Sequence, residues 1–249
     1  TVDINIQQTS NDTYLKANKL VSPLINSYDI LENSIGIKMN SENTYIDADL
    51  IVYENLNKIS SDKYEYIYPK IDFTKKIKNQ TNLVGNFLFK SNNYMQNYET
   101  NIFEKININD LIFNSDPKIT KKGFYNNYEF LLKNSNSSSE NSSNFKNGED
   151  LYFSGLFQFN SSLPLIKKNN NFQRLLKPKI ALKISPDNTK DISKNTNRLD
   201  VNNIYNLNRL SSSETVEGGI SLTYGSDYTL TKTKSNQDIF SIKIANNLR

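Results

Sequence analysis

The chain alternates apolar and polar residues in many short stretches. The clearest lies between Thr215 and Tyr224, where even-numbered positions are apolar or Gly and odd-numbered positions are polar or Gly. Successive side chains of a β-strand point to opposite faces, so this stretch predicts a strand with one apolar and one polar face. A long polar segment precedes it, and long loops before such strands recur along the chain.

The same alternation predicts about twelve strands of roughly 9 to 12 residues and no long helix. Within these strands the alternating residues stand out most clearly at 2–6, 13–21, 35–39, 46–52, 63–75, 83–90, 124–133, 151–159, 176–184, 215–224 and 240–244. Residues 92–118 fit either a strand or part of a loop. Pro69 argues against a central strand of a soluble sheet, because proline cannot donate a ladder hydrogen bond.

The predicted connections tend to alternate in length. Residues 10–12, 41–43 and 76–80 form short turns, whereas 134–149 and 186–213 are predicted to be long extracellular loops. Residues 134–147 contain a single apolar residue, Phe145, so we expect this Ser- and Asn-rich tract to be mobile. Residues 199–213 contain six apolar side chains, enough to fold this loop inward as an ordered segment.

Strand length separates the possible folds. Strands of soluble sandwiches average about 5 to 6 residues, roughly half the length predicted here. A solenoid would need a fixed repeat, and none appears. Tyrosines near strand ends, such as Tyr64 and Tyr125, favour a membrane interface over a soluble sheet. The prediction is therefore all-β: residues 1–249 form one domain, an antiparallel transmembrane β-barrel segment that is an incomplete, open curved sheet.

Composition removes several function classes. The chain lacks Cys, His and Trp, which excludes disulfides, Cys/His metal sites and imidazole-based catalysis within it. The net charge of +4 comes from scattered Lys and Arg, too weak a signal for nucleic acid. We expect no enzymatic activity and no cofactor. Because the chain begins at Thr1 in mid-pattern, we expect an internal segment of a longer protein.

Several segments resemble the outer-membrane lipopolysaccharide-assembly family LptD, also called OstA or Imp. The similar segments are residues 10–15 (SNDTYL), 62–71 (DKYEYIYPKI), and the set 199–209 (LDVNNIYNLNR), 216–219 (VEGG) and 224–225 (YG). The last set is the most specific, and the order matches that family over most of the chain. Where the family has a Gly-x-Asp-Arg sequence, this chain has Ser212 to Thr215 (SSET). A salt bridge from that arginine therefore does not carry over.

The resemblance implies a location in the outer membrane of a Gram-negative bacterium. It implies lipopolysaccharide, outer-membrane lipid, an LptE-like lipoprotein plug and periplasmic bridge proteins as partners, the last through a domain outside this segment. The alternative function is that of a porin or a TonB-dependent-type transporter barrel. An outer-membrane enzyme is disfavoured because such enzymes usually need His.

Candidate site residues fall into two groups. The lumen-lining candidates are Lys177, Lys179, Lys183, Asp47 and Asp49. The second group comes from the segment with the most specific resemblance: Asn203, Leu207, Asn208, Arg209, Glu217, Gly218 and Gly219. Polar residues facing a barrel interior need no specific role, because that interior is polar in any such barrel. Arg209 and Glu217 fit either a buried pair that holds the loop or two exposed, unpaired charges.

Overall fold

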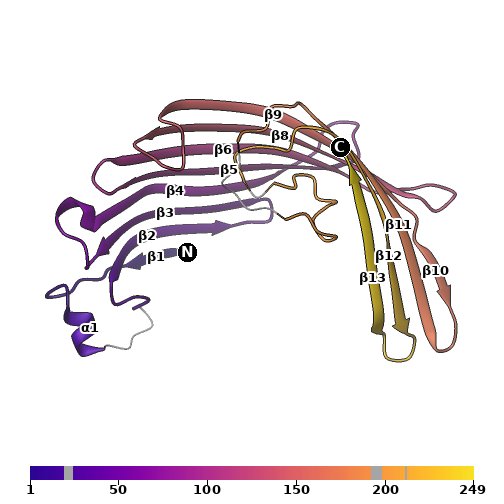
Figure 1. The fold of residues 1–249 in the computed structure, drawn as a ribbon, viewed down its shortest axis with the longest axis horizontal. Coiled ribbons are helices and arrows are strands. Elements are labelled where there is room, and N and C mark those ends of the chain that lie inside the picture. Colours follow the sequence, from indigo (N-terminus) through magenta and orange to yellow (C-terminus); the bar gives the residue numbers. More distant parts are fainter. Residues whose placement is uncertain (20–24, 192–197, 211) are drawn as a thin grey trace. The chain divides into compact units, whose positions relative to one another are not determined.

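The computed structural model describes residues 1–19, 25–191, 198–210 and 212–249. They form a single antiparallel sheet of thirteen strands, which is open and does not close into a barrel (Figure 1). The two described helices are short, α1 (Tyr14–Asn18) and η1 (Ser60–Lys63). The predicted all-β, antiparallel, open fold is confirmed.

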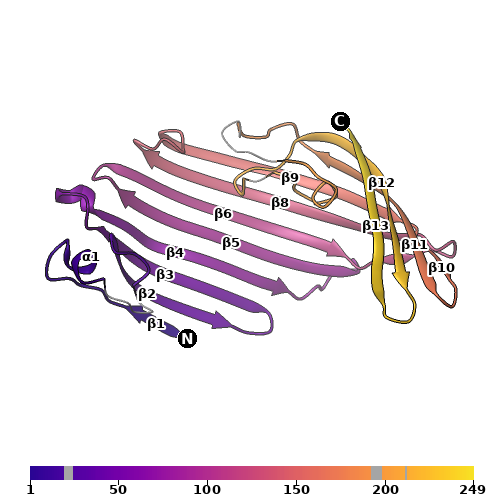
Figure 2. The same cartoon turned by 60° about the horizontal axis from the view of Figure 1, so that its bottom comes forward.

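The strand order is β1-β2-β3-β4-β5-β6-β8-β9-β11-β12-β13, with β7 beside β8 and β10 beside β11 (Figure 2). The bounds are β1 Val2–Asn5, β2 Ile30–Asn40, β3 Thr44–Asn55, β4 Tyr64–Ile77, β5 Gly85–Tyr98, β6 Ile102–Ser115, β7 Lys118–Ile119, β8 Tyr125–Glu140, β9 Gly148–Ser162, β10 Leu165–Lys168, β11 Phe172–Ser185, β12 Gly219–Lys232 and β13 Gln237–Leu248.

Contacts divide the chain into two compact units. The first comprises Thr1–Lys76, Phe89–Asn109 and Asn134–Tyr152, and the second comprises Ile77–Leu88, Asp110–Lys133 and Phe153–Arg249. Strands β4, β5, β6, β8 and β9 contribute residues to both units, β4 by Ile77 alone.

In the first unit, β2 and β3 form the predicted hairpin, in which Ile37 lies opposite Ala48. The pairing of β3 with β4 shifts register between Asp49 and Ile51, at the position of Pro69. Such a bulge adds a residue on one strand and reverses the alternation of faces beyond it. Tyr64 and Tyr66 stack at 6.1 Å, as expected for side chains two residues apart on one face. Pro69 thus occupies an irregular position inside the sheet, which is one of the few places a strand admits proline.

In the second unit, β11 pairs with β12 over fourteen consecutive residue pairs, from Phe172 opposite Lys232 to Ser185 opposite Gly219. Strand β12 then pairs with β13, and β11 pairs on its other side with β9 and β10. We call the side of these strands that carries Ile180 and Tyr224 the apolar face, and the side that carries Lys183 the polar face.

Four sequence predictions about elements were wrong. Residues 14–18 of the predicted second strand form α1, and residues 20 and 21 lie outside the described residues. Residues 10–12 are therefore no strand-to-strand turn, because β1 pairs directly with β2. Residues 92–118, which fitted either a strand or part of a loop, are mostly strand, because β5 continues to Tyr98 and β6 covers Ile102–Ser115. Strand β12 begins at Gly219, four residues after Thr215.

The predicted loop at 134–149 is the fourth error. Strand β8 runs on to Glu140 and β9 begins at Gly148, so only residues 141–147 connect them. The tract needs no apolar core, because a strand within a sheet satisfies its backbone groups through its neighbours. Its side chains also pair: Asn136 Nδ2 donates to Asn134 Oδ1 at 2.9 Å, and Asn134 Nδ2 donates to Asn136 Oδ1 at 3.2 Å.

Candidate functional site

The segment between β11 and β12, residues 186–218, is a long connection whose described residues make many side-chain hydrogen bonds. We call it the motif loop; its residues 192–197 and 211 lie outside the described residues. It contains a turn around Asp200, whose Oδ1 accepts hydrogen bonds from the backbone N–H groups of Asn202 (2.7 Å) and Asn203 (3.1 Å). Asn203 in turn donates from Nδ2 to the carbonyl of Arg198 at 2.8 Å. Short polar side chains that bond nearby backbone in this way stabilise turns.

A buried ion pair lies at the base of the loop. Arg209 Nε donates to Glu217 Oε2 at 2.6 Å, and Arg209 Nη2 donates to Glu217 Oε1, so the pair is bidentate. The two residues are 4% and 7% exposed. The guanidinium also reaches Ser221 Oγ at 3.0 Å and Thr223 Oγ1 at 3.4 Å on β12. Of the two arrangements open to the sequence, the structure therefore has the buried pair, with most of its donors used.

Asn208, next to Arg209, bonds to the backbone close to and at Glu217. Its Nδ2 donates to the carbonyl of Thr215 at 3.0 Å, and its Oδ1 accepts from the N–H of Glu217 at 3.3 Å. Thr215 and Val216 between them are fully buried. The side chain of Asn208 thus joins its own part of the loop to the backbone of Thr215 and Glu217.

The loop rests on the polar face of the second unit. Three strand side chains donate to its backbone: Gln158 to the carbonyl of Tyr205 (2.8 Å), Lys183 to that of Asn206 (2.8 Å) and Lys133 to that of Ser213 (2.7 Å). These contacts come from β9, β11 and β8, so one loop is fixed to three strands. The prediction of an ordered loop is confirmed for its described residues.

The Tyr205 side chain of the loop lies against Gly225 of β12. A Cβ on Gly225 would come within 2.7 Å of the Tyr205 hydroxyl oxygen and within 2.1 Å of the carbonyl oxygen of Ile244. Lys179 Nζ lies 4.4 Å from the centre of the Tyr205 ring and 2.7 Å from Asp227 Oδ2. Glycine at 225 therefore allows the ring to approach the strand backbone, and a cation–π contact adds to the packing.

The environment of the loop alters two pKa values. Burial alone would raise the pKa of the Glu217 carboxyl, but the hydrogen bonds from Arg209 and the nearby cations lower it overall. Burial, with a smaller effect of Asp227, raises the pKa of the Tyr205 hydroxyl. Both shifts keep each group in the charge state that the loop contacts require: Glu217 ionised and Tyr205 neutral.

The candidate lysines on β11 do different things. Lys183 is 4% exposed and lies 3.6 Å from Glu217, so it belongs to the loop site, and Lys179 joins through Tyr205. Lys177 is half-buried and lies opposite Asp227 in the strand register. Sequence alternation placed all three on one face but gave no signal for the loop that covers two of them.

The two candidate aspartates belong to the first unit. Asp47 accepts a hydrogen bond from the Tyr45 hydroxyl at 3.0 Å and lies 3.5 Å from Lys38 Nζ. Asp49 faces Gly36, where a Cβ would lie 2.5 Å from its carboxylate oxygen. These contacts of the two carboxylates are thus local ones within the first unit.

The glycines and remaining motif residues complete the loop's end. The N–H of Gly218 donates to Thr189 Oγ1 at 2.7 Å, and a Cβ there would lie 2.7 Å from the carbonyl oxygen of Pro186. Gly219 has a φ of +87°, a left-handed conformation that favours glycine. Leu207 is half-buried. Sequence reasoning missed Gln158 and Thr189, because single polar residues at polar positions carry no distinguishing signal.

The two faces of the strands have the reverse of the usual exposure. On the apolar face, Ile180 is 42% and Ile244 is 64% exposed, whereas on the polar face Gln158 is 1% exposed. The predicted alternation of outward apolar and inward polar residues on β9 and β11 agrees with these exposures. Soluble monomers rarely present such a continuous apolar surface to water.

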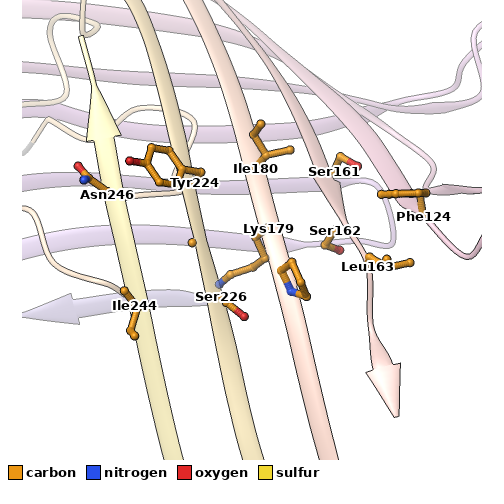
Figure 3. Close-up of a pocket in the computed structure, with 12 residues that line it drawn as sticks. Phe124, Ser161, Ser162, Leu163, Lys179, Ile180, Tyr224, Ser226, Ile244 and Asn246 are labelled. Atoms are coloured by element: carbon orange, nitrogen blue, oxygen red, sulfur yellow. The ribbon is translucent and has the colours of Figure 1, made fainter.

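The apolar face contains a groove of about 540 Å³ (Figure 3). Figure 3 shows Phe124 and Leu163 at one side and Tyr224 with Ile244 at the other, around the smaller residue Ser226. The Ser226 Oγ is buried and has no hydrogen-bond partner among the described residues. The volume suits a small apolar group, and the groove lacks convergent polar groups that would fix an oriented polar ligand.

No group of three or more acidic, His or Cys side chains that could hold a metal ion occurs in the described part of the chain. None of the helices at residues 1–19, 25–191, 198–210 or 212–249 is long and apolar enough to cross a membrane. Comparison with known proteins found no protein-family model and no curated protein that matches the sequence.

Proposed function

We propose that this chain forms part of the wall of an outer-membrane β-barrel that assembles lipopolysaccharide into the outer leaflet. The observation that carries the proposal is the reversed exposure of the strands, with Ile180 and Ile244 outward and Gln158 and Lys183 buried. Lipid surrounds an apolar face at no cost, whereas water does not. Strands enter a membrane only as part of a closed barrel, so the open sheet would require additional strands.

The motif loop supports the more specific part of the proposal. Its residues Asn208, Arg209 and Glu217 belong to the most specific of the segments that resemble the LptD family, and they form one bonded network. The loop covers the polar face, which in a barrel faces the lumen. By lying there it would narrow the pore and leave lipopolysaccharide a lateral route. The segment would supply wall and loop; a lipoprotein plug and periplasmic bridge proteins would engage the complete protein.

Depletion of the complete protein in living cells tests this function. Newly made lipopolysaccharide should fail to reach the cell surface and accumulate in the inner membrane, as measured by surface labelling and membrane fractionation. If surface lipopolysaccharide is unchanged while uptake of a small solute falls, the protein is a porin or transporter and the proposal is wrong.

A deletion tests the sealing role of the loop. Removing residues 203–209 should raise permeability to large antibiotics, because the contacts of Tyr205, Asn206 and Arg209 with the polar face are lost. The matched control removes residues 142–146 from the connection between β8 and β9, outside either strand. Equal permeability in the two deletions would show that the loop does not seal the pore.

A further inference from the structure

Basic residues that are scattered along the sequence lie close together at the turns of two hairpins in the second unit, β10–β11 and β12–β13. The turn between β10 and β11 and the turn between β12 and β13 lie side by side, because the N–H of Thr233 donates to the carbonyl of Asn171 at 3.0 Å. Five exposed cations surround them: Lys167, Lys168, Arg174, Lys232 and Lys234. We call this set the cationic rim.

Two of these cations oppose each other directly. In the register of β10 with β11, Lys167 lies opposite Arg174, and like charges opposite each other destabilise a strand pair. The nearby acid, Asp238, accepts a hydrogen bond from Thr231 at 2.7 Å. None of the five makes an ion pair with any residue that the structure describes. The rim therefore concentrates uncompensated positive charge at one end of the sheet.

The residue types along the apolar face change in a definite order toward this rim. Most large mid-strand residues are aliphatic, such as Ile180 and Ile244, with Tyr224 as an aromatic residue among them. Next comes an aromatic pair, Tyr228 and Phe240, with ring centres 6.2 Å apart. The face ends in cations: Lys232 lies opposite Phe172 in the register.

This order matches the profile of a bilayer from its hydrocarbon core, through the interface where aromatic side chains concentrate, to the phosphate level. A protein partner would require positive charge but not the graded sequence of apolar, aromatic and basic positions. We propose that the cationic rim binds the phosphate groups of anionic phospholipid headgroups on the short-turn side of the membrane. The inference rests on the proposed location of the strands in a membrane.

The test uses the complete protein reconstituted in bilayers of phosphatidylcholine mixed equally with phosphatidylglycerol. Spin-labelled forms of each lipid report the relative association constant of the two lipids at the protein surface. The triple variant Lys167→Gln/Arg174→Gln/Lys232→Gln should lower the preference for phosphatidylglycerol by about fivefold or more, since each basic residue near an anionic surface contributes about that factor. High salt should lower the wild-type preference in the same direction.

Two matched variants separate charge from structure. Lys167→Arg/Lys232→Arg keeps the charge and should keep the preference. Lys19→Gln/Lys105→Gln/Lys146→Gln removes the same charge from exposed positions in the first unit and should also keep it.

An unchanged preference in the rim variant overturns the inference but leaves the proposed function standing. Loss of an acidic protein partner without a change in lipid preference assigns the rim to that partner and also overturns it. Failure of the wild-type protein to insert into any bilayer contradicts the proposed function itself.

Discussion

Two stretches with many Asn or Ser residues are ordered in different ways. Residues 134–140 in the first unit continue β8 as regular strand. Residues 198–210 in the second unit form no strand and instead fold as a loop on the polar face. Residues 134–140 contain no apolar side chain, whereas residues 198–210 contain six that do not follow the period of a strand. What differs is where their backbone groups find partners.

In β8 the backbone groups bond to the neighbouring strands, so the side chains need only fit between their neighbours. Ser135 and Ser139 are almost fully buried, and their small size suits close neighbours. In the motif loop the backbone carbonyls are satisfied one by one by side chains from the sheet, as Lys183 does for Asn206. The backbone of a segment rich in polar residues can therefore be satisfied either through a strand ladder or through a few specific side-chain donors.

The comparison predicts that the loop depends on single residues. Arg209→Met should leave the Glu217 carboxylate buried without its main partner. We expect a loss of about 3 to 5 kcal/mol in stability, the usual cost of breaking a buried pair from one side. Urea unfolding and protease cleavage within residues 198–210 would measure it.

Two controls bracket this effect. Arg198→Ala changes an exposed side chain of the same loop and should have little effect. The double variant Arg209→Met/Glu217→Met removes both buried charges and should recover much of the lost stability. A single variant no less stable than the wild type would show that the pair does not hold the loop.

The strand stretch should instead depend on its backbone. Ser135→Pro removes a ladder donor inside the sheet and leaves its partner carbonyl unsatisfied, so it should be strongly destabilising. Ser135→Ala changes only the hydroxyl, whose Oγ is buried and has no hydrogen-bond partner among the described residues, so stability should be unchanged or slightly higher. Thermal unfolding of the two variants makes the comparison at one position. Equal stability of both would mean that residues 134–140 are not held as strand.

The two faces of β11 offer a third contrast. Ile180→Arg places a charge on the apolar face of β11 and should cost about 2 to 4 kcal/mol if that face meets lipid near the bilayer midplane. Lys177→Ala, three residues away on the polar face, should have little effect. Assembly measured by the heat-dependent shift in electrophoretic mobility would compare them, and equal effects would contradict the assignment of faces.

A smaller effect concerns pH. Because Arg209 and nearby cations lower the pKa of Glu217 below its ordinary 4.5, the pair stabilises the loop fully above that pH. This contribution should be lost as the pH falls through the lower pKa of the folded state. Protease cleavage of the loop should thus increase below about pH 4.5. Glu217→Gln should cleave readily at neutral pH and lack the pH step attributable to this carboxyl.

The alternation of residues predicted most strands because each face of a strand has one kind of environment. It predicted the hairpin of β2 and β3 and the faces of β11, where every second residue carries information. It failed for residues 134–140, where Ser and Asn occupy both faces and the period disappears. It also failed for Tyr14–Asn18, a single helical turn too short to show a helical period.

The site was predictable in part. Arg209 and Glu217 stood out through the resemblance, but their pairing depends on a fold of the loop that sequence spacing does not specify. The contacts of Gln158 and Lys133 with the loop span 47 and 80 residues along the chain. The cationic rim was missed altogether, and the expectation of scattered charge was wrong for this end of the second unit. Strand pairing, which sequence alone did not fix, brings Lys167 opposite Arg174.

The central claim is that the apolar face of these strands contacts lipid. This chain contains no Cys, so after replacement of any Cys elsewhere in the complete protein, single cysteines can be introduced at each position from 179 to 184 and spin-labelled in intact membranes. The account predicts a period of two: labels at 180, 182 and 184 collide with membrane-dissolved oxygen, and labels at 179, 181 and 183 do not. Uniform collision at all six positions, or preferential contact of 180, 182 and 184 with a water-soluble relaxing agent, would contradict it.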